Sequence, residues 1–374
     1  MLAALLYGKE DLRLEHIADP APAAGEVVLR VGTATTCGTD LKVWRRGGHA
    51  RMLTPPTVFG HEAAGEIVAL GEGVTQWRIG DRVVANNSAP CMTCFFCQKE
   101  EYSLCQDLLF NNGTFAEYLK IPAPIVQHNL LPIPAGVPYE LAAMTEPLAC
   151  VLHGAARSQV QPGDRVVVLG DGAIGLMFVA ALASGRGDWS GPQLSTHNSL
   201  GSSSGSSPDD SPGISSPYAE VFLFGGSDQR LQVGQKLGAV KTFNYRQVED
   251  VPALVKQLTD GWGADVVIEA TGVAAVWEMA IACARPGATV NLFGGCPRDT
   301  TITVNTEQLH YSELTLKGVF HNTPKYVRAA LALLASQTLP FELLISDRQP
   351  LSELAQVFED MRQRKVIKVA ISPS

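Results

Sequence analysis

The sequence predicts an α/β protein built from two units, a small β-barrel and a doubly wound parallel sheet. Short β-branched runs separated by turns fill the first third, whereas strands alternate with helices from about residue 150 to about residue 320. The length of 374 residues also exceeds what one compact core usually holds.

Three runs rich in β-branched residues predict strands of a small barrel or sandwich, because Gly-Asp and Gly-Glu steps punctuate them. They are EVVLRV at Glu26–Val31, GEIVAL at Gly65–Leu70 and DRVVA at Asp81–Ala85.

After Pro147 the pattern changes to alternating strands and helices, which indicates a parallel sheet. The expected strands are Asp164–Gly170, Ala219–Gly225, Ala264–Gly272 and Ala288–Gly295, and the expected helices are Ala173–Ala183, Asp228–Gly238 and Trp277–Cys283. Helices near Tyr326–Ala335 and Leu351–Met361 and a last strand, Lys368–Ser372, are expected to close the chain.

Residues 185–217 interrupt this alternation with a stretch rich in Gly, Ser, Pro and Asp. Such a composition cannot bury enough apolar surface to offset the entropy of ordering. We interpret it as a flexible surface insertion between the first helix and the second strand of the sheet; a docking loop or lid is the alternative.

Charge and hydropathy exclude several classes of protein. The net charge of −8 argues against nucleic acid as a partner, because phosphates demand a basic surface. The first positive charge, at Lys9, follows the apolar residues, which is the reverse of a secretory signal. No apolar run is long enough for a membrane helix. We therefore expect a cytoplasmic protein, and charged residues at only 18% favour buried subunit contacts.

Four of the eight cysteines form a C-x2-C-x2-C-x7-C array: Cys91, Cys94, Cys97 and Cys105. Zinc prefers thiolates in a tetrahedron, and closely spaced cysteines can surround one ion. The alternatives are an iron–sulfur cluster and unliganded or disulfide-bonded cysteines. Because thiolates fill all four positions, we expect a structural zinc without an open coordination site.

A second set of potential ligands is scattered along the chain: Cys37 in TTCGTD, His61 and Glu62 in FGHEAAGEI, and Glu146 in TEPLAC. Each residue has an ordinary structural explanation by itself. Taken together, they offer the mixed sulfur, nitrogen and oxygen ligands of a catalytic zinc that keeps an exchangeable position.

These motifs, with GEIVALGEGVTQWRIGDRV, GTFAEY at Gly113–Tyr118 and a later G-x-G-x-x-G, resemble the zinc-containing medium-chain alcohol dehydrogenase family. Within that family the chain most resembles the sorbitol and threonine dehydrogenase branch, which carries a glutamate at the position of the one in TEPLAC. The resemblance implies a GroES-like β-barrel catalytic domain (1–149 and 321–374), a Rossmann domain (150–320), and a homodimer or homotetramer.

The resemblance also implies roles for individual residues. Cys37 and His61 would be fixed zinc ligands, and Glu62 and Glu146 would be ligands that exchange with water or substrate. Asp40 would orient His61, and Thr39 would hydrogen-bond the substrate oxygen and take its proton. Zinc lowers the pKa of a bound oxygen group, which suits the removal of a proton from an alcohol.

One position departs from the family pattern. Relatives often carry a histidine five residues after the zinc cysteine, at the end of a proton relay, and this chain has Lys42 there. Both Lys42 and His49 remain candidates for the proton exit.

The glycines of VVVLGDGAIG predict a dinucleotide site. Gly170, Gly172 and Gly175 follow an apolar strand and open a helix, and this context is what makes G-x-G-x-x-G indicate a dinucleotide site. The glycines allow the pyrophosphate to approach the helix N-terminus. We assign Ile174, within the motif, and Thr271, near the end of the expected strand Ala264–Gly272, to the same cofactor site.

The choice between NAD and NADP depends on the end of the second strand, where NAD enzymes usually carry an acid. Gly225 occupies that position once the insertion is discounted, with Ser227 and Arg230 nearby. This pattern favours NADP slightly, although for Arg230 itself a place on the helix surface is favoured over a phosphate contact.

The remaining candidates receive structural interpretations. Cys150, Cys283 and Cys296 are expected in the core, as are Met177 and Phe178, and His321 is expected near the cleft, with either a substrate-facing or a structural role.

The function predicted from the sequence is hydride transfer between a secondary alcohol, polyol or amino alcohol and NAD(P), with two zinc ions per chain. The glycine turn argues against a zinc hydrolase. The open ligand set argues against the other rival, a catalytically silent dinucleotide-binding sensor.

Overall fold

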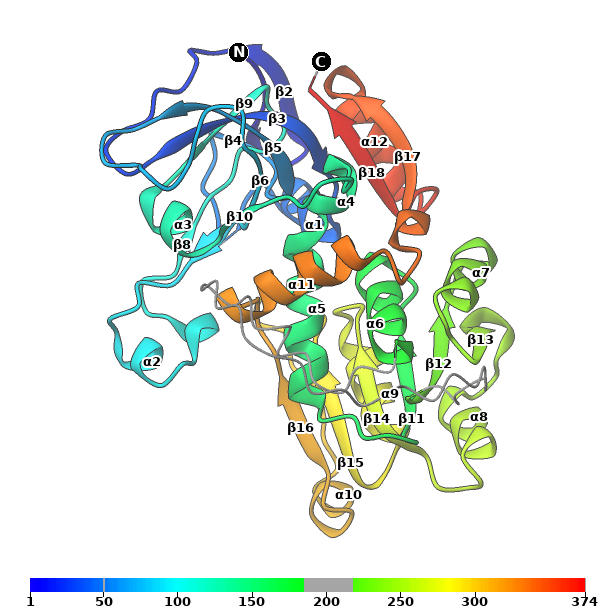
Figure 1. The fold of residues 1–374 in the computed structure, drawn as a ribbon. Helices are drawn as coiled ribbons and strands as arrows, with labels where there is room; N and C mark the ends of the chain where they lie inside the picture. Colours follow the sequence, from blue (N-terminus) through cyan, green and yellow to red (C-terminus); the bar gives the residue numbers. More distant parts are fainter. Residues whose placement is uncertain (50, 185–217, 374) are drawn as a thin grey trace, which may run out of the picture.

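A computed structural model describes residues 1–49, 51–184 and 218–373, and these form two units side by side (Figure 1). One unit contains mostly antiparallel strands and both ends of the chain, and the other contains a parallel sheet flanked by helices. The insertion expected at 185–217 lies outside the described residues.

The first unit is organised around a seven-stranded sheet. Its strands run in the order β10-β6-β5-β3-β18-β17, with β9 also paired to β3. Their bounds are β3 Val27–Thr35, β5 Ala63–Leu70, β6 Arg82–Ala85, β9 Tyr118–Ile121, β10 Leu130–Pro132, β17 Ile345–Pro350 and β18 Lys368–Ser372. Neighbouring strands are antiparallel except β17 and β18.

Two smaller sheets complete this unit. One has the order β2-β1-β4, and the other pairs β7 with β8. The strands are β1 Leu2–Gly8, β2 Asp11–His16, β4 Thr57–Val58, β7 Ser88–Ala89 and β8 Leu109–Phe110. The helices of the unit are α1 Gly38–Arg46, α2 Phe95–Gln98, α3 Ala123–His128, α4 Tyr139–Ala143 and α12 Leu354–Arg362.

The end of the chain returns to the first unit and pairs with its central strand. In β18, Ala370 lies opposite Thr35 and Ile371 lies opposite Ala34 of β3. Phe358 of α12 stacks on Phe59, with ring centroids 5.9 Å apart. Residues from the two ends of the chain therefore share one hydrophobic core.

The second unit is a six-stranded sheet with the order β13-β12-β11-β14-β15-β16, and every neighbouring pair is parallel. Its strands are β11 Arg165–Leu169, β12 Glu220–Gly225, β13 Lys241–Asn244, β14 Ala264–Glu269, β15 Ala284–Leu292 and β16 Thr315–Gly318. The order places the first strand of the unit, β11, in the middle of the sheet, as in dinucleotide-binding folds.

Helices cover both faces of this sheet because alternate side chains of its strands point to opposite faces. In β11, Val166 and Val168 belong to one buried cluster, whereas Val167 and Leu169 belong to the other. The helices are α5 Thr145–Ser158, α6 Ala173–Ala183, α7 Asp228–Lys236, α8 Val251–Leu258, α9 Ala274–Ala282, α10 Thr306–Tyr311 and α11 Pro324–Ser336.

The predicted fold class is confirmed, and most elements lie within a few residues of their expected bounds. The helices α4 and α5 were not predicted, and α5 runs through the expected domain boundary at residue 149. The division into domains at 149 and 320 therefore stays a prediction. In the described part of the chain, no helix has the length and apolar character needed to cross a membrane.

Candidate metal centres and cofactor cleft

The four clustered cysteines converge on one point. Their sulfur atoms all lie within 4.8 Å of one another, and all four thiols are free rather than disulfide-bonded. The Sγ atoms of Cys91 and Cys97 are 3.9 Å apart, as are those of Cys94 and Cys105. A zinc tetrahedron with 2.3 Å bonds has edges of about 3.8 Å, so the array fits a zinc ion.

Backbone amides support negative charge on these sulfurs. The amides of Cys91 and Cys94 donate to Cys105 Sγ and Cys91 Sγ at 3.3 and 3.4 Å. Hydrogen bonds from Thr93 lower the pKa of Cys91 to about 6. Burial, by contrast, raises the pKa of Cys97 to about 12 and also raises the pKa of Cys105. A thiolate is the form that binds metal, so the loop is arranged to hold a cation.

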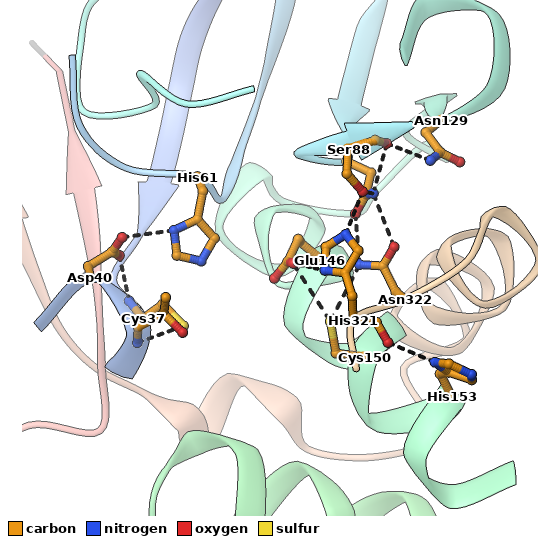
Figure 2. A network of polar contacts seen from close by, with 12 residues as sticks. Cys37, Asp40, His61, Ser88, Asn129, Glu146, Cys150, His153, His321 and Asn322 are labelled. Carbon is orange, nitrogen blue, oxygen red and sulfur yellow. Dashed lines mark hydrogen bonds and ion pairs between the residues drawn. The ribbon is translucent and has the colours of Figure 1, made fainter. Parts of the chain in front are cut away.

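Cys37, His61 and Glu62 form a second convergent group, with ligand atoms within 4.8 Å of one another. Cys37 caps the N-terminus of α1, and its sulfur accepts from the Thr39 amide at 3.4 Å. Asp40 Oδ1 lies 2.8 Å from His61 Nδ1 (Figure 2). The other ring nitrogen of His61 is thereby left for a metal.

Glu62 is fully buried between polar groups that hold its carboxylate. Its Oε2 accepts from Lys368 Nζ at 2.6 Å and from the Thr35 hydroxyl, and the Lys368 side chain is 1% exposed. Its Oε1 is buried without a hydrogen-bond partner among the described residues. An unpaired buried carboxylate oxygen beside Cys37 and His61 fits a metal ligand, because such an atom is otherwise costly.

Glu146 belongs to a different group. Its ligand atom lies within 4.8 Å of those of Cys150 and His321 rather than joining Cys37, His61 and Glu62. Cys150 Sγ is 3.7 Å from Glu146 Oε1, and His321 Nδ1 is 3.9 Å from it (Figure 2). The structure thus places Glu146 outside the group of Cys37, His61 and Glu62 that the motifs predicted it to join.

The surroundings of Glu146 favour its neutral form. Burial raises the pKa of Glu146 to about 7. His321 Nε2 is 2.5 Å from the Ser88 hydroxyl, and Asn322 donates to Cys150 Sγ at 3.4 Å. The carboxyl group therefore sits in a polar but water-poor network from which it could move.

The two candidates for proton exit have different surroundings. Lys42 Nζ is exposed and donates to the Thr271 carbonyl at 3.4 Å, across the seam between the two units. His49 Nδ1 accepts from the Arg51 and Met52 amides at 3.2 and 3.1 Å. Burial lowers the pKa of His49.

The glycine turn has the geometry that a dinucleotide needs. Gly170 has a φ of 123°, which favours glycine. A Cβ on Gly175 would lie 1.8 Å from the Gly170 carbonyl oxygen, whereas a Cβ on Gly172 would meet no atom within 4 Å. Helix α6 begins directly after Gly172 and includes Ile174. The open side of the turn thus exposes a helix N-terminus, which binds anions.

Thr271 lies in a loop organised by a buried carboxylate. Glu269, the last residue of β14, accepts from the Thr271 and Gly272 amides at 2.7 and 3.0 Å. Burial raises the pKa of Glu269. The loop faces Lys42, so the carboxyl ends of the parallel strands meet the unit that carries the candidate metal ligands.

The end of β12, where the adenosine ribose is expected to bind, agrees with the prediction at two residues and differs from it at one. Gly225 ends β12 and Ser227 caps α7, as predicted. Arg230 is buried rather than a helix surface residue, and one nitrogen of its guanidinium is engaged, because Nη2 donates to the carbonyls of Arg364 and Val366 at 3.3 and 2.6 Å. Its side chain is only 10% exposed.

Sequence reasoning missed several residues of these sites: Asp171, Glu269, Lys368, Ser88 and Asn322. Asp171 stands inside the G-x-G-x-x-G motif, so its position was a usable signal. Lys368 had none, because it is separated from Glu62 by 306 residues. Cys150, expected only in the core, contacts Glu146 instead.

Two family models match the chain. The alcohol dehydrogenase GroES-like domain covers residues 23–135, and the zinc-binding dehydrogenase covers residues 218–336. The sorbitol dehydrogenase of Halalkalibacterium halodurans is 31% identical over 98% of this chain and 97% of its own. The L-threonine 3-dehydrogenase of Bacillus licheniformis is 30% identical, covering 98% and 96%.

A solved structure from Sinorhizobium meliloti 1021 with NADP bound superposes with a TM-score of 0.83 at 25% identity, covering 100% of this chain and 99% of that one. The fold and the site thus define a zinc-binding dehydrogenase with a nicotinamide cofactor. The chain belongs to the zinc-containing medium-chain alcohol dehydrogenase family, as its motifs predicted. Nothing in these comparisons favours a catalytically silent sensor.

Proposed function

We propose that this enzyme transfers a hydride between NAD(P) and a secondary alcohol of the polyol or amino alcohol class. The main support for the proposal is the placement of the candidate metal ligands and the glycine turn relative to each other. The group of Cys37, His61 and Glu62 and the glycine turn belong to different units, and Lys42 and Thr271 join those units at the same edge. Relatives named for sorbitol and threonine support this substrate class.

In this proposal Cys37 and His61 would be the fixed ligands of the zinc, and the unpaired oxygen of Glu62 would be a further ligand. When bound, zinc acts as a Lewis acid that favours loss of the hydroxyl proton in one direction and polarises the carbonyl in the other. Asp40 keeps the His61 ring oriented through its bond to Nδ1.

Glu62 and Glu146 differ in how firmly they are held. Lys368 and Thr35 fix one oxygen of Glu62, whereas Glu146 rests against the weaker partners Cys150 and His321. Glu146 is therefore the carboxylate that moves in this proposal. Its neutral form would give up a proton on becoming a ligand, and its ionised form would take up a proton on leaving. Thr39, in the first turn of α1, accepts the substrate proton in this scheme.

For the proton exit we favour Lys42. Its amine lies at the seam between the two units, 3.4 Å from the Thr271 carbonyl, whereas two backbone amides already occupy His49 Nδ1.

Two zinc ions per chain, a cytoplasmic location and a homodimer or homotetramer belong to the same proposal. The slight preference for NADP rested partly on Arg230, whose guanidinium is engaged by backbone carbonyls. The choice of cofactor then depends on the other residues of that corner.

The test combines metal analysis with a substrate screen. The purified enzyme should contain two zinc ions per chain, one at the four clustered cysteines and one at the group of Cys37, His61 and Glu62. A panel of polyols, amino alcohols and simple secondary alcohols, each with NAD and with NADP, should produce reduced nicotinamide with at least one polyol or amino alcohol. Zinc-loaded enzyme that reduces neither cofactor with any of them would refute the proposal.

A further inference from the structure

A carboxylate occupies the space at the end of β12 that the strand itself leaves empty. Gly225 has no side chain, and a Cβ placed on it would lie 2.4 Å from Asp171 Cβ and 2.6 Å from Asp171 Oδ2. Asp171 comes from the glycine turn after β11, yet its side chain reaches across to the neighbouring strand. The carboxylate that the second strand lacks is therefore supplied from the first turn.

Asp171 is fixed there by contacts on both of its oxygens. Oδ2 accepts from the Gly226 and Ser227 amides, each at 2.8 Å. Oδ1 accepts from Arg364 Nη2 at 2.7 Å, and Arg230 Nη1 lies 4.0 Å from it. The side chain is 1% exposed, so these hydrogen bonds and the surrounding atoms fix its position.

We propose that Asp171 determines the choice of dinucleotide and makes this enzyme prefer NAD over NADP. This inference takes one assumption from the proposed function, which is that the adenosine ribose of the cofactor binds at the end of β12. It replaces the slight preference for NADP that the glycine at position 225 suggested.

The physical reason lies in which groups remain free to meet the 2′ position. Backbone amides at a strand–helix junction are good donors to an anion, but Asp171 already occupies those of Gly226 and Ser227. Neither amide is therefore free to donate to a 2′-phosphate, and the phosphate would also meet the like charge of the Asp171 carboxylate, whereas an uncharged 2′-hydroxyl meets no such repulsion.

The two arginines around Asp171 predict what happens when the carboxylate is removed. Arg364 is 45% exposed on its side chain and pairs with Asp171, and Arg230 approaches the same oxygen. Without Asp171, two guanidinium groups and two backbone amides would surround one empty position. Those are the groups that bind phosphate, so replacing Asp171 should reverse the preference.

The test measures binding of adenosine fragments, so that it does not depend on turnover. Isothermal titration calorimetry would compare 5′-AMP with 2′,5′-ADP on the full-length, zinc-loaded enzyme. The unmodified enzyme should bind 5′-AMP at least about tenfold more tightly, and Asp171→Ser and Asp171→Asn should bind 2′,5′-ADP more tightly, each tenfold step being about 1.4 kcal/mol.

Asp260→Asn is the matched control. Asp260 pairs with Arg165 at the opposite end of β11, so the variant changes the net charge equally and should keep the preference of the unmodified enzyme. An unmodified enzyme that prefers 2′,5′-ADP, or Asp171 variants with an unaltered ratio, would overturn the proposal. Normal fragment preference without any dehydrogenase activity would count against the proposed function alone.

A reciprocal exchange tests the spatial argument even if a single variant folds poorly. Gly225→Asp alone should lower the melting temperature, because its side chain would collide with Asp171. Combined with Asp171→Gly, the same substitution should recover the melting temperature and the preference for 5′-AMP. A double variant as unstable as Gly225→Asp would show that the two side chains do not compete for one space.

Discussion

Replacing Lys368 by methionine should destabilise the metal-free enzyme far more than the zinc-loaded enzyme. The Lys368–Glu62 pair is 2.6 Å long, with side chains 1% and 0% exposed. Removing one partner of a buried pair leaves an uncompensated charge and costs about 3–5 kcal/mol. A zinc ion beside the free oxygen of Glu62 would neutralise much of that charge, so the loss should shrink when the metal is bound.

The assay is thermal unfolding followed by circular dichroism, with and without zinc. Arg348→Met is the control, because the Arg348–Glu140 pair has the same 2.6 Å separation but side chains 59% and 23% exposed. Exposed pairs contribute about 0–1 kcal/mol, so this variant should change little in either state. Equal shifts for Lys368→Met in both metal states would refute the assignment of Glu62 to the metal. Equal shifts for both variants would refute the argument from burial.

Three further predictions concern the metal sites and the proton path. Cys97→Ser should lower the melting temperature, whereas Cys37→Ser should abolish turnover and leave the fold intact; equal loss of thermal stability in both would contradict the division into structural and catalytic metals. Asp40→Asn should weaken zinc binding about 10–100-fold, as measured by competition with a chelator, and unchanged affinity would mean that His61 needs no orienting partner. Lys42→Ala should lower kcat about 100-fold and His49→Ala less than about threefold, because two amides already occupy His49 Nδ1; steady-state rates with the opposite order would identify His49 as the relay.

The sequence predicted the four inner strands of the parallel sheet, β11, β12, β14 and β15, because each contains a buried apolar run. The edge strands β13 and β16 were not predicted, because KTFN and TLKG are short, partly polar and partly exposed. The helix expected at Ala173–Ala183 has those same bounds in the structure, since it is apolar on all sides and ends where the apolar run ends. Helix α5 was not foreseen. It contains Pro147 in its first turn and begins with the polar pair Thr145 and Glu146, so its pattern resembled a turn between domains.

The candidate site was predictable where its residues occur in short motifs. Cys37, Asp40 and His61 come together as the motifs implied, because the N-terminus of α1 and the start of β5 adjoin in the barrel. Lys368 was not predictable, since one lysine near the end of the chain carries no local sign of burial. Asp171 was visible within the glycine motif, but only coordinates reveal that it crosses to the end of β12.

The return of β18 to β3 has a consequence for biosynthesis. All six strands of the parallel sheet lie between residues 165 and 318, so that sheet can complete its pairing while the last fifty or so residues are still being made. The barrel cannot, because Lys368, which pairs with Glu62, opens β18, and β18 is translated after the whole parallel sheet. A ribosome-bound chain would therefore hold a finished nucleotide fold beside an incomplete metal site. Truncation of β18 should leave the enzyme able to bind adenosine fragments but unable to retain an ion at Cys37, His61 and Glu62.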